Sequence, residues 1–208
     1  MNTGRICVWG DSLTFGINDT EEGGWVNRLR DYTNNEIEED IIVYNLGILG
    51  DNTEKLLNRF EIECKVREPE VVIFAIGLND SQYINTIEYP RVTLKNFTKN
   101  IQKLINIAKK FTDKIGFIGL TRVDVTRTRP LAWDDTKNYE NEVIRKYDSQ
   151  LKITVSSNGV KYLYMLDLLE NSDLSDGLHP NSNGHEKMYV RIKDFIFDEL
   201  MGGDKNDR

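Results

Sequence analysis

The chain has 208 residues, of which 39% are hydrophobic, and its formal net charge at pH 7 is −7. This length and hydrophobic fraction predict one globular domain with a sizeable core. The acidic balance argues against nucleic acid or an anionic membrane as a partner, because both attract basic surfaces. No apolar run approaches the roughly 18 residues of a membrane span, so we expect no stable membrane insertion.

The start of the chain and its cysteines bear on where the protein is found. The first predicted strand begins at residue 5, so from the sequence we expect no secretory signal peptide. The two cysteines, Cys7 and Cys64, occupy apolar positions and suit reduced, buried thiols. The Cys/His clusters of metal sites are missing from the sequence. We therefore expect a cytoplasmic protein that needs no metal or cofactor.

Strands and helices are predicted to alternate along the chain. Apolar runs with the length of strands buried in a parallel sheet occupy residues 5–9, 41–46, 71–76, 114–120 and 161–166. Apolar residues recur at helical spacing over residues 25–32, 56–64, 94–108, 139–155 and 188–200. Right-handed crossovers between such strands give an α/β fold, a three-layer α/β/α sandwich with a central parallel sheet of about five strands. We expect one domain over 1–201 and a flexible tail over 202–208.

Two helix starts carry capping signals. Thr53 precedes the second helical stretch and is a candidate N-cap. Asn183 and Glu186 have the spacing of a capping box at the start of the last helix. Both signals predict where a helix begins, not what the protein does.

A serine follows the first strand in the string Gly10-Asp11-Ser12-Leu13. At the exit of a buried strand, a serine hydroxyl can point into a crevice beside the positive start of a helix. Taken alone, Gly-Asp-Ser is also ordinary turn chemistry. Ligand sites of parallel α/β sheets lie outside the carboxyl ends of the strands, so other motifs at strand ends add weight to this one.

The second and third strands are also followed by candidate site residues. Gly50, within residues 45–53, can present an unobstructed backbone N–H to a carbonyl oxygen, or it can simply serve a strand-to-helix turn. Asn79 follows Gly77, and its amide can donate to an oxyanion or close a turn. We expect the neighbouring Asp80 to brace the loops.

The chain has two histidines, and one of them has a carboxylate nearby. His179 follows Asp176 by three residues, and Pro180 favours an extended backbone at the histidine. One short loop can therefore deliver a base and the group that fixes its tautomer. His185 lacks such a carboxylate, and we expect it to be structural.

Taken in chain order, these blocks resemble the SGNH (GDSL) hydrolase superfamily, whose fold is flavodoxin-like. The blocks are Gly10-Asp11-Ser12-Leu13, residues 45–50, Gly77-x-Asn79-Asp80 and Asp176-x-x-His179. The resemblance implies that Ser12 is a nucleophile, His179 its base and Asp176 the group that orients the base. It further implies an oxyanion hole made by the backbone N–H groups of Ser12 and Gly50 and the side chain of Asn79.

The resemblance predicts a carboxylic ester hydrolase that cleaves a small ester through an acyl-enzyme intermediate. A carbohydrate O-deacetylase, an acyl thioesterase or a lysophospholipase would use the same residues and stays open as an alternative. A non-catalytic flavodoxin-like binding module is disfavoured, because a decayed site should lack at least one of these residues. The oligomeric state is not predicted.

Two long irregular stretches, 81–89 and 121–138, are expected to set the choice of substrate. Candidate substrate-binding residues are Asp11, Tyr83, Arg122 and Trp133. Trp133 can equally pin its loop to the body of the protein. The sequence leaves open whether Arg122, Arg127 or Arg129 faces the pocket. It shows no long apolar lid, which argues against long-chain lipid substrates.

Overall fold

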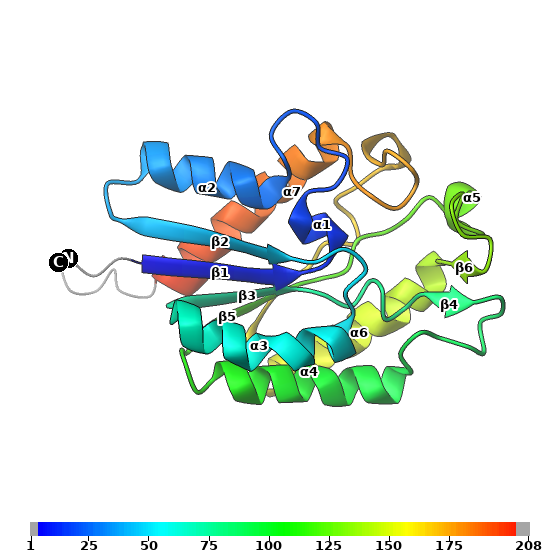
Figure 1. Cartoon of the computed structure of the whole chain (residues 1–208), viewed down its shortest axis with the longest axis horizontal. Helices are drawn as coiled ribbons and strands as arrows, with labels where there is room; N and C mark the ends of the chain where they lie inside the picture. The colour runs from blue at the N-terminus through cyan, green and yellow to red at the C-terminus, as the bar shows by residue number, and fades with distance from the viewer. Residues whose placement is uncertain (1–3, 203–208) are drawn as a thin grey trace.

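A computed structural model describes residues 4–202, which form three layers with a parallel sheet in the middle (Figure 1). The strand order is β2-β1-β3-β5-β7. The strands are β1 (Gly4–Gly10), β2 (Ile41–Gly47), β3 (Val71–Ala75), β5 (Lys114–Ile118) and β7 (Lys161–Leu163). The predicted five-stranded parallel sheet is confirmed, although β7 ends three residues before the predicted residue 166. Except for Gly202, the tail expected at 202–208 lies outside the described residues.

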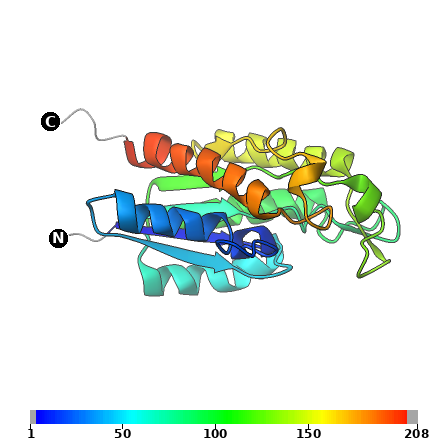
Figure 2. The ribbon, with the colours of Figure 1, turned by 90° about the horizontal axis from the view of Figure 1, so that it is seen from above.

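Helices cover both faces of this sheet (Figures 1 and 2). On one face α2 (Trp25–Glu36) packs against α7 (Ser182–Asp194), which continues into the π-helical segment Phe195–Met201. The other face carries α3 (Thr53–Arg67), α4 (Leu94–Ala108) and α6 (Asn141–Ser157). Three short helical turns complete the chain: α1 (Ser12–Phe15), α5 (Val125–Thr128) and the 3-10 helix Asn171–Asp173.

The core is densest around β1, the strand that lies between β2 and β3. Its residues Ile6 to Trp9 are fully buried, as expected for a strand covered on both faces. Trp9 meets Phe60 of α3 edge-on with ring centroids 4.8 Å apart, and Phe74 packs on Phe117 at 4.6 Å. These rings fix α3 against the centre of the sheet.

The sheet has a topological switch point between β1 and β3. From β1 the chain passes to β2 on one side, and from β2 it returns to β3 on the other side. The loops that leave β1 and β3 therefore diverge and open a crevice at the carboxyl edge of the sheet. The serine and asparagine motifs both lie at this edge.

A second, two-stranded sheet was not predicted. Strand β4 (Tyr83–Ile84) pairs antiparallel with β6 (Lys137–Asn138), and Tyr83 also bridges to Pro90. The pairing joins the two long stretches beyond the carboxyl edge of the main sheet (Figure 1). Strands of two residues are too short for an alternating pattern, so the sequence carried no signal for them.

Both predicted caps are displaced by neighbouring contacts. The N-cap of α3 is Asn52, whose side chain accepts from the backbone N–H of Lys55 at 3.0 Å. Thr53 does not cap, because its N–H and hydroxyl both donate to Asp80.

At α7 the cap is Asn181, which accepts from the backbone N–H of Gly184 at 3.0 Å. The predicted cap, Asn183, instead donates its side-chain amide to Asp173 at 2.6 Å. The two differences have the same cause, because each predicted capping side chain hydrogen-bonds to an aspartate outside its helix, Asp80 or Asp173.

A buried ion pair between Asp19 and Arg28 ties the loop after α1 to α2. The Asp19 carboxylate also accepts from the backbone N–H of Gly24 at 2.8 Å, and Arg28 reaches Glu186 of α7 at 2.9 Å. Burial by itself would raise the pKa of Asp19, but the Arg28 guanidinium and the N–H donors hold it well below its usual range.

Replacing Asp19 by Asn should lower the free energy of unfolding by about 3 kcal/mol at pH 7, because Arg28 loses its buried partner. A depressed folded-state pKa stabilises the fold above the unfolded value near 4 and loses this effect as pH falls. The deficit of the variant should therefore shrink between about pH 4 and pH 2. Urea unfolding across this range measures it.

The matched control is Asp167→Asn, since Asp167 pairs with Arg191 at the surface, where its side chain is 56% exposed. This change should cost less than about 1 kcal/mol at any pH. A deficit for Asp19→Asn that stays constant down to pH 2 would contradict the role assigned to the pair.

Candidate active site

Ser12 is the first residue of the short helix α1 and lies directly beyond β1. Asp11 caps this turn, and its carboxylate accepts from the backbone N–H of Leu13 at 3.0 Å. The turn packs so tightly on the sheet that a Cβ at Gly10 would overlap Thr14 and the carbonyl of Ala75. The glycine thus allows the sharp exit that points the serine hydroxyl away from the core.

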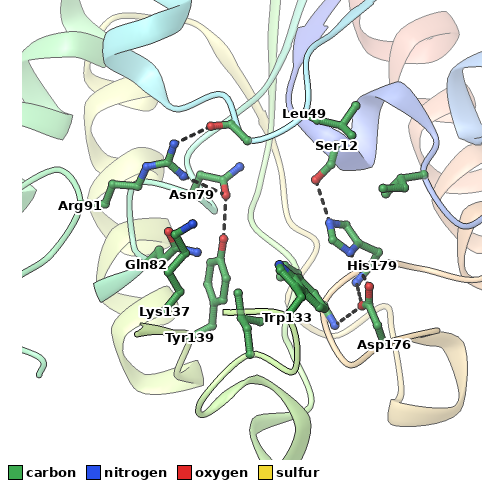
Figure 3. A pocket seen from close by; sticks show the side chains of 14 residues that line it. Ser12, Leu49, Asn79, Gln82, Arg91, Trp133, Lys137, Tyr139, Asp176 and His179 are labelled. Atoms are coloured by element: carbon green, nitrogen blue, oxygen red, sulfur yellow. Dashed lines mark hydrogen bonds and ion pairs between the residues drawn. The ribbon is translucent and has the colours of Figure 1, made fainter. Parts of the chain in front are cut away.

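A continuous chain of contacts links Ser12, His179 and Asp176 (Figure 3). The Oγ of Ser12 lies 2.9 Å from Nε2 of His179, and Nδ1 of the same ring lies 2.7 Å from Oδ2 of Asp176. An ionised carboxylate can only accept, so Nδ1 holds the proton and Nε2 is free to accept from the serine. The three residues predicted from the sequence are brought together in this geometry.

The Asp176 carboxylate is held in its charged form. Its Oδ1 accepts from the backbone N–H groups of Leu178 and His179 at 2.9 and 2.8 Å, and Asn18 donates to Oδ2 at 3.1 Å. Burial alone would raise the pKa of Asp176, but the donors, with the His179 ring foremost, hold it well below its usual range. A charged Asp176 is what keeps the proton on Nδ1.

Ser12, Gly50 and Asn79, the three residues expected to donate to an oxyanion, line the same cavity. Within residues 4–202, the backbone N–H groups of Ser12 and Gly50 have no acceptor in the protein. Asn79 donates its amide to the carbonyl of Asp51 at 2.9 Å and, across a long 3.3 Å, to Asp11. The long bond is the weaker of the two, and an oxyanion can replace it.

Gly50 has a backbone conformation that favours glycine. Its φ is +70°, a conformation that glycine adopts without strain. A Cβ built on it would meet no atom of the protein within 4 Å, so the positive φ, and not crowding by the protein itself, favours glycine here.

Tyr139 and Arg91 fix the orientation of the Asn79 amide. The Tyr139 hydroxyl donates to Oδ1 of Asn79 at 2.7 Å, and Arg91 approaches the same oxygen at 3.5 Å. Arg91 also donates to the carbonyl of Gly50 at 2.7 Å. Because Tyr139 and Arg91 both meet Oδ1, the NH₂ group of Asn79 faces the other way, where it donates to Asp51 and Asp11.

Sequence reasoning missed the roles of both residues. The apolar spacing assigns Tyr139 to a helical stripe, but α6 begins only at Asn141. Burial raises the pKa of the Tyr139 hydroxyl far above the usual value, so it stays a donor. Arg91 lies in a loop with no periodic pattern. Both residues belong to the segments that the β4–β6 sheet organises, which the sequence did not reveal.

Two buried carboxyls lie behind the site. Burial raises the pKa of Asp11 to about 6 and that of Asp80 to about 7. Asp80 accepts from the backbone N–H of Thr53 at 3.0 Å, which joins the loop after β3 to the start of α3. This is a bracing contact between the loops that carry Gly50 and Asn79.

The site opens into a cavity of about 390 Å³. Its lining residues are Ser12, Ile17, Leu49, Gly50, Asn79, Gln82, Arg91, Leu131, Trp133, Lys137, Tyr139, Asp176, Leu178 and His179. Trp133 is half-exposed at this cavity, and its ring lies nearly parallel to that of His179 with centroids 5.9 Å apart. Among the candidate substrate-binding residues, Trp133 is therefore the one that the structure brings to the cavity.

The other three candidates do not line the cavity. Asp11 is buried beneath Ser12, and Tyr83 is buried in the small sheet. Arg122 donates to the side chain of Asn171 at 2.9 Å instead.

The other two arginines of the same loop are also used by the protein. Arg127 pairs with Asp124 and donates to the carbonyls of Leu174 and Ser175, which supports the loop before Asp176. Arg129 pairs with Glu140 at 3.2 Å. The arginine that lines the cavity is Arg91.

The second histidine has a structural environment. His185 is fully buried, its Nδ1 lies 3.4 Å from the backbone N–H of Trp25, and its Nε2 lies 3.1 Å from the carbonyl of Ile17. An N–H can only donate and a carbonyl can only accept, so the ring is neutral with its proton on Nε2. Burial lowers the pKa of His185, which keeps it in this form.

The described residues contain neither a metal-binding cluster nor a membrane-spanning helix. Over 4–202, no group of three or more His, Cys, Asp and Glu side chains is arranged to hold a metal ion. In the same part of the chain, no helix combines the length and apolar character needed to cross a membrane.

Comparison with known proteins identifies the family. Residues 8–187 match the model of the GDSL-like Lipase/Acylhydrolase family, and the chain belongs to this family. A curated relative, the uncharacterized protein YpmR of Bacillus subtilis, is 24% identical over 209 residues, which cover 90% of this chain and 79% of YpmR.

Solved structures share the fold. A lipase/acylhydrolase from Enterococcus faecalis has a TM-score of 0.76 at 20% identity, covering 95% of this chain and 97% of its own. An acetylxylan esterase from Geobacillus stearothermophilus has a TM-score of 0.72 at 19% identity, covering 92% and 94%. At these identities the likeness establishes the SGNH-like fold and leaves the substrate open.

Replacing Tyr139 by Phe should lower kcat for an activated ester about tenfold and leave KM nearly unchanged. The hydroxyl orients a donor that acts on the transition state, so its loss should not weaken ground-state binding. In an Asn79→Ala background the same change should have no further effect, because the group that it orients is already gone.

Tyr147→Phe is the matched control, since this buried hydroxyl donates to the carbonyl of Val92 and does not line the cavity. It should leave kcat unchanged. Equal losses of kcat in the two tyrosine variants would show that Tyr139 contributes only to stability.

Proposed function

We propose that the protein is a serine hydrolase that cleaves small carboxylic esters through an acyl-enzyme intermediate. The observation that carries this proposal is the unbroken chain from the Ser12 hydroxyl through His179 to the charged Asp176, on the wall of a cavity. Ser12 and Gly50 line the same cavity, and their backbone N–H groups have no acceptor within residues 4–202. The same arrangement of roles recurs on unrelated folds that perform acyl transfer.

In the first half of the reaction, Ser12 Oγ attacks the ester carbonyl carbon. Its proton passes to Nε2 of His179, which lies 2.9 Å away. The resulting imidazolium is stabilised by Asp176 and returns the proton to the oxygen of the departing alcohol. The carbonyl re-forms, and the acyl group remains on Ser12.

In the second half, water takes the place of the alcohol. His179 accepts a proton from the water as it attacks the acyl-serine, and the same proton then goes back to Ser12 Oγ. The acid is released and the resting contacts are restored.

The oxyanion that forms in both halves meets the N–H groups of Ser12 and Gly50 and the amide of Asn79. These donors are fixed before the reaction, so they stabilise the developing charge without reorganising. Loss of one such donor costs on the order of 3 kcal/mol of transition-state stabilisation.

The cavity volume bears on the alternatives. A space of about 390 Å³ suits a small acyl group better than the long chain of a lysophospholipid. A thioester or an O-acetylated sugar would be cleaved by the same residues. A module that only binds ligands would have no use for the complete hydrogen-bonded chain at Ser12.

The proposal is tested with 4-nitrophenyl acetate or butyrate. Ser12→Ala and His179→Ala should each lower kcat at least about 10³-fold, and the double variant should be scarcely worse, because the two residues act as a unit. Melting temperatures of these variants should stay near that of the wild type, since neither side chain belongs to the hydrophobic core.

His185→Ala provides the control within the same chain. It should keep most of the turnover and lose stability, because His185 is fully buried and contacts Ile17 and Trp25. A variant lacking Ser12 that retains turnover near the wild-type rate would refute the proposed mechanism.

A further inference from the structure

We propose that one wall of the cavity, formed by Arg91 and Lys137, binds a negatively charged group of the substrate, a carboxylate or a phosphate. We call these two residues the cationic wall. The inference rests on the proposed ester hydrolysis and narrows its substrate to esters that carry an anion close to the scissile bond.

The β4–β6 sheet builds the cationic wall. Lys137 is part of β6, Gln82 directly precedes β4, and the backbone N–H of Arg91 donates to the carbonyl of Gln82 at 2.7 Å. Figure 3 shows these side chains on one side of the cavity, with His179 and Asp176 on the other. A substrate attached to Ser12 therefore lies between the catalytic residues and the wall.

Arg91 keeps unused donors next to the oxyanion hole. A guanidinium carries five N–H groups. Within residues 4–202, Arg91 donates to the carbonyl of Gly50 and approaches Oδ1 of Asn79, and no carboxylate lies within ion-pair distance of it. The remaining N–H groups of a positive, half-buried side chain are therefore free for a ligand.

Gln82 lies beside Arg91 and Lys137 and lines the same cavity. It is only 3% exposed, and its Oε1 has no hydrogen-bond partner among the described residues. An amide oxygen only accepts, so this atom does not bind the anion and suits a donor on another part of the substrate.

The balance of donors and acceptors favours an anion over a neutral sugar. The free polar atoms on the wall are mainly N–H donors of Arg91 and Lys137. The nearby Tyr139 hydroxyl already donates its hydrogen bond to Asn79. Sugar hydroxyls need acceptors as often as donors, whereas a carboxylate or phosphate only accepts. The apolar residues Ile17, Leu49 and Leu178 line the same cavity and suit the uncharged part of the ester.

Lys137 offers a way to change the wall without touching the oxyanion hole. Its Nζ pairs with Oδ2 of Asp134 at 2.7 Å, and the two side chains are 40% and 28% exposed. Oδ1 of Asp134 accepts from Thr136, so Asp134→Asn can keep that contact and remove only the charge. Substitution of Arg91 would disturb Gly50 and Asn79 as well, so Lys137 is the position to vary.

The test compares charged and neutral esters of similar size. One pair is 4-acetoxybenzoate and its methyl ester, which differ in charge on the alcohol side. The other is 4-nitrophenyl hydrogen glutarate and 4-nitrophenyl pentanoate, which differ on the acyl side. Each kcat/KM is divided by the uncatalysed rate, and wild-type protein should favour the charged member of at least one pair about tenfold.

Changes at the Lys137–Asp134 ion pair should move this preference in opposite directions. Lys137→Ala should lower it several-fold, and Asp134→Asn should raise it, because the ammonium loses its neutralising partner. The preference should also fall as salt is raised from 0.05 to about 0.5 M, since the wall is partly exposed.

Lys114→Ala is the matched control. Lys114 forms an ion pair with Glu70 at 2.9 Å and has a similar exposure, but it begins β5 at the opposite edge of the sheet from the site. The variant makes the same change in net charge and should leave the preference for charged esters unaltered.

The outcomes separate this inference from the proposed function. If wild-type protein hydrolyses the neutral esters and shows no preference for either charged one, the cationic wall is wrong and ester hydrolysis stands. Equal preferences in Lys137→Ala and Lys114→Ala would likewise refute the wall and leave ester hydrolysis standing. If the wild type cleaves none of the four esters, the proposed function is wrong, and this inference, which rests on it, is wrong as well.

Discussion

The register of three parallel strands is the constraint on which the site depends. Gly10 at the end of β1 lies opposite Gly47 of β2 and Ala75 of β3, so three strand exits are aligned at one edge of the sheet. The next residues along each exit deliver Ser12, Gly50 and Asn79. A slip of one residue in either pairing would turn these groups to other sides, because side chains alternate along a strand.

The rest of the site is divided between two structural units on either side of that edge. The loop before α7 supplies Asp176 and His179, and Arg127 supports it through backbone carbonyls of the same loop. The small β4–β6 sheet supplies the residues that orient Asn79 and form the cationic wall. Base and oxyanion donors are therefore positioned by different segments, which are joined by hydrogen bonds from Asp124 and Arg127 to the loop that carries Asp176.

Electrostatics differ sharply across a short distance in this acidic protein. Asp176 is held in its charged form by four donors, whereas burial raises the pKa of Asp11 to about 6 and of Asp80 to about 7. At pH 7 these values leave Asp11 mostly charged and Asp80 only partly charged, so Asp80 opposes a developing oxyanion less than an ordinary carboxylate would. Arg91, on the other side of Asn79, adds positive charge near the same point.

The sequence by itself predicted the sheet, the layers and the five residues that we propose as triad and oxyanion hole. These follow from local signals, since buried strands have a characteristic composition and each motif lies within a few residues of a strand end. Only the tertiary structure shows that the cavity is also lined by Tyr139, Arg91 and Lys137. Their roles depend on the pairing of β4 with β6, which are far apart in the chain, and two-residue strands leave no periodic trace in a sequence. Arg122 likewise depends on a residue distant in sequence, because its guanidinium donates to Asn171 and does not line the cavity.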